Sequence, residues 1–286
     1  MTDGVLVLDK AAGISSAKAL NETKQRFGRK TKVGHAGTLD PFATGILLAL
    51  VGDATRLSAI AMALPKTYEA TVRFGWQTDT LDPDGEVVAE ADPGTDAPSG
   101  LAEAARSLVG SIEQMPPAYS ALKVDGRRAY DLARAGQEIE LQPRVVQVHE
   151  VRIDAVAWPR VRITVRCGQG TYIRAIARDL GVALGLPASL ETLRRSAIGP
   201  FDRAQDELID PVVLARAANL VECRLEPADA LRFAVGGVVA CDGPDSERCA
   251  VLLGERLIGL GELRSGRLHP RAVLSRARAD LERSGL

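Results

Sequence analysis

The sequence predicts an α/β (α+β) protein, in which a large domain of mixed strands and helices precedes a small β-rich module. Over residues 4–198, apolar runs of strand length alternate with segments whose apolar residues recur at helical spacing. Beyond about residue 228, short apolar runs are broken by glycine, and a helical tail is expected after Pro270. The 286 residues have room for both units. We therefore expect two domains, residues 1–228 and residues 229–286.

The strands of the large domain are expected where apolar residues run together or alternate with polar ones. These strands are predicted at residues 4–8, 45–51, 66–74, 144–155, 160–167 and 188–198. Helices are predicted where a capping residue precedes an apolar stripe. They are expected after Ser15 or Ser16, at 53–64, at 100–109, within 116–136 and from Thr171. The stretch 77–98, rich in Asp, Pro and Gly, is expected to be a loop or weak hairpin.

The composition is that of an ordinary globular protein, with 46% hydrophobic residues, 26% charged residues and a net charge of −1. The charge is unevenly placed, because residues 24–32 hold five bases and no acid, whereas 79–103 hold acids and no base. The five bases are Lys24, Arg26, Arg29, Lys30 and Lys32. A near-neutral total can hide a basic face, with the acidic segment turned away from it. Each run alone could equally be a solvated surface.

Cysteine and histidine usage argues against a metal site. The four cysteines show no CxxC spacing, and none of the three histidines has metal-ligand spacing with a cysteine. Reduced thiols are typical of the cytoplasm. The start of the chain lacks a basic n-region, and no apolar run has the length of a membrane span. We therefore expect a cytoplasmic protein with no metal, no cofactor and no contact with a membrane.

The most informative stretch is GHAGTLDPFATG, from Gly34 to Gly45. It has three glycines, one proline and a single carboxylate, Asp40, and no helical or strand period runs through it. We expect a shaped loop rather than part of a ladder. Pro41 disfavours the helical region for Asp40 and holds it extended. Taken alone, the Asp-Pro pair could simply start a turn.

This stretch, continuing into ILLALVGDATRL, resembles the catalytic signature of the TruB-type pseudouridine synthases, which convert a uridine in the T-loop of tRNA (position 55) to pseudouridine. Four other segments resemble further motifs of the family: VLVLDKAAGISS, KTYEATVRFG, PPAYSALKVDGRRAYDLARAG and CGQGTYIRAIARDLG. The sequence departs from the family at Ala11, where a proline is more usual. The resemblance implies the pseudouridine synthase fold, with a large mixed, mainly antiparallel central sheet flanked by helices. For the C-terminal module it implies a PUA-like RNA-binding domain.

The reaction needs the glycosidic bond broken, the uracil turned and the bond remade through carbon 5. Glycosidases use two carboxyl groups, but uracil can leave as an anion, so one carboxylate in a dry pocket suffices. Asp40 is the only acid in the central stretch. Whether it attacks the sugar, attacks the base or removes a sugar proton stays open. The resemblance makes Arg174 the ion-pair partner that keeps Asp40 charged. It makes Tyr68 the aromatic that stacks on the flipped uracil and could assist proton removal from carbon 5.

Three further residues receive roles from the resemblance. Leu193 resembles the apolar floor of the pocket, His35 the residue that fills the space left by the flipped base, and Lys10 the family lysine near the active site. Without the resemblance, Leu193 would be read as packing, His35 as a surface turn residue and Lys10 as a solvent-exposed residue at a strand end.

The expected partner is the T-arm of tRNA, bound by a monomer through shape and backbone charge. Besides the run at 24–32, the bases expected to meet phosphates are Lys123, Arg127, Arg128 and Arg134. A catalytically silent RNA-binding protein is the main alternative, and it would need the basic surfaces without Asp40, Tyr68 and Arg174. A nucleoside hydrolase would need a water-activating partner such as an aspartate cluster with calcium, which the central stretch does not offer.

Overall fold

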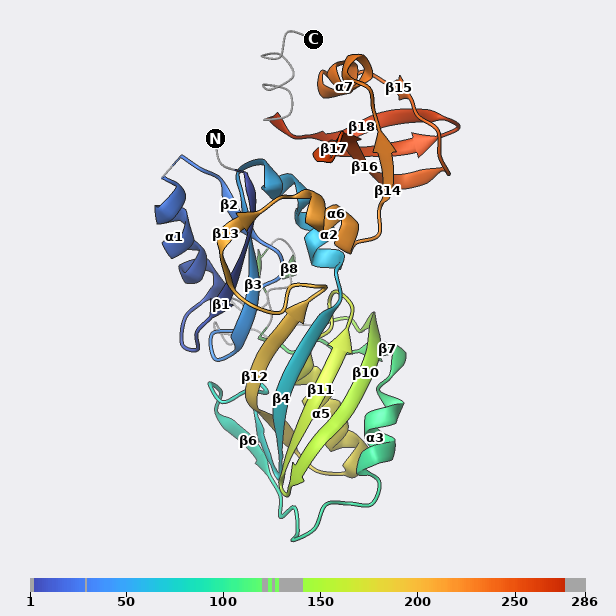
Figure 1. The fold of residues 1–286 in the computed structure, drawn as a ribbon. Coiled ribbons are helices and arrows are strands. Elements are labelled where there is room, and N and C mark those ends of the chain that lie inside the picture. Colours follow the sequence, from blue (N-terminus) through green and yellow to red (C-terminus); the bar gives the residue numbers. More distant parts are fainter. Residues whose placement is uncertain (1–2, 29, 120–122, 125–126, 129–140, 276–286) are drawn as a thin grey trace.

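The fold was analysed in a computed structural model, which describes residues 3–28, 30–119, 123–124, 127–128 and 141–275 (Figure 1). In these residues the chain builds one large sheet with helices packed on it. A smaller sheet near the C-terminus lies beyond one end of the large sheet (Figure 1). None of the helices in these ranges is both long and apolar enough to cross a membrane.

The large sheet is mixed and mainly antiparallel, as expected from the resemblance. Its described strands follow the order β13-β1-β3-β12-β4-β11-β10-β7, with β2 paired to β3. Only β3 and β12 run parallel to each other in this sheet as described. The bounds are β1 Gly4–Lys10, β2 Val33–His35, β3 Thr44–Val51, β4 Lys66–Phe74, β7 Gly110–Gln114, β10 Arg144–Ala157, β11 Arg160–Cys167, β12 Ala188–Ile198 and β13 Gln205–Ile209. The six strands predicted from the sequence are all present.

The parallel contact between β3 and β12 depends on glycine. Gly45 lies opposite Arg195 of β12 and has a φ of 106°. A Cβ atom there would lie 2.2 Å from the Arg195 carbonyl oxygen, which no side chain could tolerate. Gly45 therefore lets the two central strands meet next to the loop that carries Asp40.

Two helices cover one face of the β4-β11-β10 half of the sheet: α3 (Leu101–Ser107) and α5 (Ile173–Leu184) (Figure 1). The apolar residues of α5 recur at helical spacing and belong to the same buried cluster as the strands below. On the other half, α1 (Ser16–Phe27) lies beside β2 and β3, and the predicted helix at 53–64 is a 3₁₀ turn, η1 (Gly52–Leu57), followed by α2 (Ser58–Ala63).

The expectation that Gly34 to Gly45 forms a loop throughout is wrong at both ends. Gly34 and His35 pair with Leu50 and Ala49 as part of β2, and β3 starts at Thr44. A three-residue strand shows no readable alternation, and only its pairing with the long neighbouring strand defines it. Residues 36–43 form the loop, which we call the Asp40 loop.

The stretch predicted as a loop or weak hairpin does form a hairpin. Its strands are β5 (Trp76–Thr78) and β6 (Val87–Glu90), which pair antiparallel. The turn between them includes Asp82, which is 5% exposed. The expectation that this acidic segment turns away from the site is therefore wrong for Asp82, because a buried arginine holds it, as described below.

The C-terminal module is a five-stranded sheet in the order β14-β16-β17-β18-β15, with α7 against it. Its elements are β14 Val221–Arg224, α7 Pro227–Ala234, β15 Val239–Ala240, β16 Ser246–Leu253, β17 Arg256–Arg264 and β18 Arg267–Val273. Pro270 lies inside β18, so the predicted helical tail does not begin directly after it, and the chain from 276 lies outside the described residues. The division of domains near residue 228 stays a prediction.

The two sheets share one apolar core. A continuous buried cluster runs from β1 and β3 through α2 and α6 (Val212–Ala217) into β16 and β17. A cut near residue 228 would remove Phe233 and its neighbours from this cluster, and would expose the apolar surface they cover.

Candidate active site

The Asp40 loop is fastened to the turn that follows β1. Lys10, at the end of β1, is 1% exposed and its Nζ donates to the Pro41 carbonyl (3.1 Å) and to two carbonyls of that turn. The Gly13 N–H donates to the same Pro41 carbonyl (2.9 Å). Lys10 is thus a buried anchor and not a solvent-exposed strand end. It fixes the residue next to Asp40.

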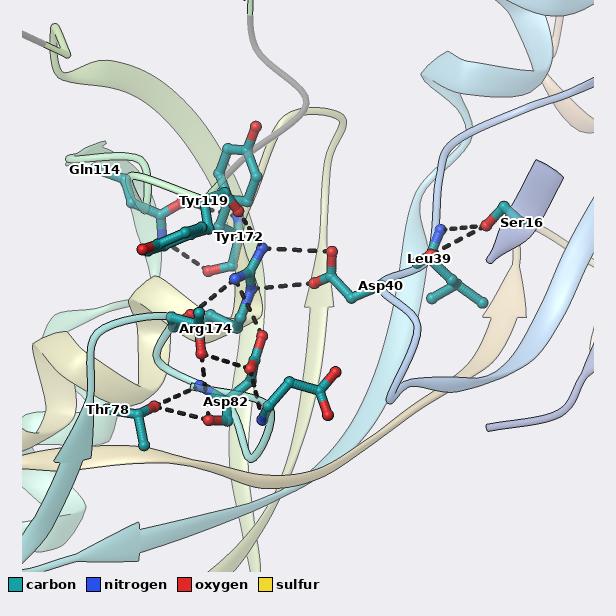
Figure 2. A network of polar contacts seen from close by, with 11 residues as sticks. Ser16, Leu39, Asp40, Thr78, Asp82, Gln114, Tyr119, Tyr172 and Arg174 are labelled. Atoms are coloured by element: carbon teal, nitrogen blue, oxygen red, sulfur yellow. Dashed lines mark hydrogen bonds and ion pairs between the residues drawn. The ribbon is translucent and has the colours of Figure 1, made fainter. Parts of the chain in front are cut away.

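The start of α1 provides a second attachment. The Ser16 hydroxyl donates to the Leu39 carbonyl (3.1 Å) and accepts from the Leu39 N–H (2.9 Å), as Figure 2 shows. Ser15 caps the helix instead, since its hydroxyl accepts from the Lys18 N–H (3.2 Å). The sequence predicted either Ser15 or Ser16 as the residue that caps the helix. In the structure Ser15 caps the helix and Ser16 binds Leu39, so both neighbours of Asp40 are held by residues at the end of β1 and the start of α1.

Arg174 stands in the first turn of α5, and the start of that helix is clamped by Gln114 of β7. The Gln114 side chain is 1% exposed, accepts from the Tyr172 N–H (2.8 Å) and donates to the Tyr172 carbonyl (3.2 Å) (Figure 2). The Tyr172 N–H is one of the groups that a helix N-terminus leaves without an intrahelical acceptor, whereas the Tyr172 carbonyl also accepts from the Ile176 N–H (3.1 Å). By fixing the start of the helix, the Gln114 side chain also fixes the direction in which the Arg174 side chain points.

The Arg174 guanidinium lies between two carboxylates (Figure 2). Its Nε is 3.0 Å from Oδ2 of Asp40, and its Nη2 donates to Oδ1 of Asp40 at 3.4 Å. The Nε contact is an ion pair without hydrogen-bond alignment. Nη1 donates to Oδ2 of Asp82 (3.1 Å) and to the Thr80 carbonyl (2.8 Å), and Nη2 donates to the Tyr119 carbonyl (2.8 Å). Arg174 is 4% exposed, so these contacts operate away from bulk water.

The two carboxylates are not equivalent. The Asp40 side chain is 36% exposed, whereas that of Asp82 is 6% exposed. Asp82 also accepts from the Thr80 hydroxyl (2.6 Å) and the Asp84 N–H (3.1 Å). Burial raises the pKa of Asp82, against the opposing effects of Thr80 and Arg174. Asp82 therefore anchors the arginine, and Asp40 is left free to meet a ligand.

Sequence reasoning missed Asp82, Gln114 and Ser16 as site residues. A signal for Asp82 was present, because the tetrapeptide TLDP occurs both at 38–41 and at 80–83. Gln114 and Ser16 carried no comparable signal, since their role depends on contacts across 58 and 23 residues of sequence.

A pocket of about 360 Å³ opens beside Asp40, within the usual range for small-molecule sites. Four of the predicted site residues line it: Asp40, Tyr68, Arg174 and Leu193. The remaining lining residues are Gly37, Thr38, Leu39, Met62, Lys66, Arg144, Gly168, Gln169, Gly170, Thr171, Tyr172, Ile173 and Arg195. Burial raises the pKa of Tyr68, so its phenol stays protonated at neutral pH. No group of three or more His, Cys, Asp or Glu side chains within the described ranges is placed to hold a metal.

His35 and Lys10 lie outside the lining of this pocket. His35 is half-buried on β2, and its Nδ1 is buried without a hydrogen-bond partner in the described part of the chain. Burial, together with the charge of Arg195, lowers the pKa of His35, so the ring is neutral at pH 7. Its role in base flipping stays a prediction.

The predicted RNA-binding bases are only partly described. Lys24, Lys30 and Lys32 are exposed at and beyond the end of α1, and Arg26 donates to the Asp206 carbonyl (2.9 Å). Arg29 and Arg134 lie outside the described residues. Lys123, Arg127 and Arg128 are described only as backbone, in β8 (Lys123–Val124) and β9 (Arg127–Arg128). Their contacts with phosphates stay predictions.

Solved structures share this fold over nearly the whole chain. A chain in the crystal structure of a Cbf5-Nop10-Gar1 complex matches with a TM-score of 0.70 at 21% identity, over 95% of this chain and 84% of that one. A chain in the structure of an H/ACA RNP bound to a substrate RNA containing 2′-deoxyuridine gives 0.69 at 20% identity, with the same coverage. At these identities the likeness concerns the fold alone.

Sequence comparison gives the family. The family profile described as "TruB family pseudouridylate synthase (N terminal domain)" matches residues 24–173. A "tRNA pseudouridine synthase B" of Azoarcus sp. (strain BH72) is 42% identical, over 96% of each chain. The protein of the same name from Nitrosospira multiformis is 44% identical, over 89% of this chain and 81% of the relative. The chain belongs to the TruB family of pseudouridylate synthases, and is therefore an isomerase that acts on RNA.

Proposed function

We propose that this chain isomerises the uridine at position 55, in the T-loop of tRNA, to pseudouridine, as a cytoplasmic monomer. That the RNA is tRNA is supported by its relatives, each named tRNA pseudouridine synthase B. The observation that carries the chemistry is the position of Asp40. It is a partly exposed carboxylate at the wall of a pocket, held by a buried arginine.

The arrangement around Asp40 suits a reaction from which water must be excluded. Arg174 offsets the negative charge of Asp40, and its second carboxylate, Asp82, fixes the guanidinium before any substrate arrives. Preorganised charge of this kind contributes most to catalysis in a dry site. Tyr68 and Leu193 give the pocket an aromatic and an apolar wall on which a flipped uracil can stack.

The catalytically silent alternative explains less of this site. A protein that only binds RNA needs exposed lysine and arginine side chains, because their binding to phosphates is favoured by the release of counterions. It does not need a guanidinium that is 4% exposed between two carboxylates, because burying these charges costs desolvation free energy. The buried network is better explained by chemistry inside the pocket.

The C-terminal module is expected to tune RNA affinity, because it contributes none of the residues that line the pocket beside Asp40. This division of labour, and the PUA-like character of the module, belong to the proposal.

The direct test is release of tritium from a T-arm transcript labelled at carbon 5 of its uridines. The isomerase must remove the carbon 5 hydrogen of one uridine, so one equivalent of label should reach the solvent. A transcript with cytidine at position 55 is the matched control and should release none. Binding of both transcripts without release from either would support the silent RNA-binding protein instead.

A further inference from the structure

Two buried cations line the pocket without a carboxylate partner. Lys66 is 5% exposed and Arg195 is 1% exposed. Within the described residues, neither side chain has a carboxylate oxygen within the 4.0 Å of an ion pair, since Asp40 and Asp82 are both paired with Arg174. Burying a cation without a counter-charge is costly, so two buried cations without a carboxylate partner are suited to binding an anionic group.

The sheet places these cations beside the predicted uracil-stacking residue. Lys66 and Tyr68 are two residues apart on β4 and therefore point to the same face. Arg195 of β12 lies directly opposite Tyr68. The Arg195 guanidinium is immobilised by the Ile46 carbonyl (2.7 Å from Nε) and the Gly37 carbonyl (3.1 Å from Nη2). The three side chains thus form one wall of the pocket.

Lys66 keeps part of its hydrogen-bonding capacity free. Its ammonium donates to the Met62 and Leu64 carbonyls at the end of α2. An ammonium has three N–H groups, and the third has no protein acceptor in the part of the chain that the structure describes. Burial, reinforced by the charge of Arg195, lowers the pKa of Lys66 to about 8. The side chain is therefore mainly charged at neutral pH and loses its proton in mildly alkaline solution.

We propose that Lys66, supported by Arg195, holds the uracil as an anion between cleavage of the glycosidic bond and its re-formation. This inference rests on the proposed function. When the C1′–N1 bond breaks, its electron pair stays with uracil, and the charge spreads over N1, O2 and O4. The free N–H of Lys66 donates to one of these carbonyl oxygens. After C5 joins C1′, the C5 hydrogen leaves as a proton and N1 takes one up, so charge is conserved.

The position of Lys66 favours the base over a phosphate as the anion. A phosphodiester stays on the RNA backbone, which meets exposed residues at the surface, whereas Lys66 is 5% exposed on the strand of Tyr68. A donor placed where charge develops lowers the barrier to cleavage, and removing one such donor costs roughly 10²–10³-fold in rate.

The test compares leaving groups. T-arm transcripts would carry uridine or 5-fluorouridine at position 55, and single-turnover loss of the target nucleoside would be measured. Fluorine withdraws electrons and stabilises the anion, so it should reduce the need for Lys66. We expect Lys66→Met to slow the uridine substrate by roughly 10²-fold or more and the fluorinated substrate by roughly tenfold less. Lys66→Arg should restore most of the rate, and Lys18→Met, at an exposed lysine, should change neither rate.

The pH profile gives an independent reading. The wild-type rate should fall as pH rises through about 8, because Lys66 then loses its charge, and in Lys66→Arg this fall should move to higher pH. If Lys66→Met does not fold, as judged by circular dichroism, this comparison carries the test alone, and an unchanged alkaline limb would refute the inference.

Other outcomes are equally decisive. Equal rate losses on both substrates would make Lys66 a structural cap of α2. A loss confined to RNA affinity would make it a phosphate contact. Either result overturns the inference and leaves the proposed function intact. A wild-type protein that releases no tritium from the uridine transcript would refute the proposed function itself.

Discussion

The tetrapeptide Thr-Leu-Asp-Pro occurs twice in this chain, and its two copies have opposite fates. At 38–41 its aspartate is 36% exposed at the wall of the pocket, and at 80–83 its aspartate is 6% exposed beneath the same arginine. Both carboxylates contact Arg174. Identical local sequence therefore supplies one reactive group and one anchor, and the difference must come from what surrounds each copy.

The two copies differ in which of their atoms, backbone or carboxylate, form hydrogen bonds with neighbouring residues. The copy at 38–41 is held by its backbone, through Ser16 on Leu39 and Lys10 on Pro41. Among the described residues, the Asp40 carboxylate itself contacts the Arg174 side chain. The copy at 80–83 closes on itself in a hairpin turn, where Thr80 and Asp84 both donate to the carboxylate. A fold can therefore keep a carboxylate reactive by fastening its neighbours and leaving its oxygens free.

The largest effect is expected from substitution of Asp40, the aspartate of the copy at 38–41. Asp40→Asn keeps the shape of the side chain but removes the negative charge of the carboxylate, so turnover should fall by at least about 10³-fold. Affinity for tRNA should stay near the wild-type value, because it is spread over many phosphates. Tritium release, a binding curve and circular dichroism would measure the three quantities. Retained turnover in the folded variant would remove Asp40 from the chemistry.

The next largest effect is expected from substitution of Arg174, which contacts both carboxylates. Arg174→Ala leaves both carboxylates unpaired, one of them buried, and loss of one member of a buried ion pair costs about 3–5 kcal/mol. We expect this fall in the free energy of unfolding, measured by urea titration, together with loss of tritium release. Arg178→Ala on the same helix is the control, since Arg178 pairs with Asp179 outside the pocket. Comparable destabilisation in both variants would contradict a special role for Arg174.

The buried copy should show a smaller effect with a distinct pH signature. Asp82→Asn can keep the two hydrogen bonds that Oδ1 accepts, but its NH2 group then faces Nη1 of Arg174 and cannot accept from it. This loosens the guanidinium, and a misplacement of about 1 Å costs roughly 10²-fold in rate. Because burial raises the pKa of Asp82, it protonates at higher pH than an ordinary aspartate as pH falls. The acidic limb of the wild-type rate profile should therefore begin early and move to lower pH in Asp82→Asn. An identical limb in both proteins would assign it to another group.

The smallest effect compares the two threonines. Thr80→Val removes the 2.6 Å hydrogen bond to Asp82 and should lower the free energy of unfolding by about 1–2 kcal/mol. Thr38→Val, the same change in the exposed copy, should leave the free energy of unfolding unchanged, since the Thr38 side chain is exposed to solvent. Equal shifts in thermal or urea unfolding would mean that the two copies are less different than their contacts indicate.

The sequence predicted the features that a local pattern can encode. Strands such as β4 and β11 alternate apolar and polar residues, and Gly37 and Pro41 lie in a loop, as their residue types predict. The partners of that loop could not be predicted, because Ser16, Gln114 and Asp82 act through contacts that only the folded sheet creates. The first strand of the loop region, β2, was missed for the same reason, since pairing with β3 defines it.

The hydrogen bonds between Ser16 and Leu39 connect the residue before Asp40 to one end of a helix of fixed length. Ser16 opens α1 and holds the residue before Asp40, while the exposed bases Lys24 and Lys30 lie near or beyond the other end of the same helix. The helix has 12 residues, which at about 1.5 Å per residue makes a rod of roughly 18 Å. If RNA phosphates bind those lysines, the length of the hydrogen-bonded helix sets the distance between these phosphates and the residues around Asp40, and the enzyme selects a uridine at that distance.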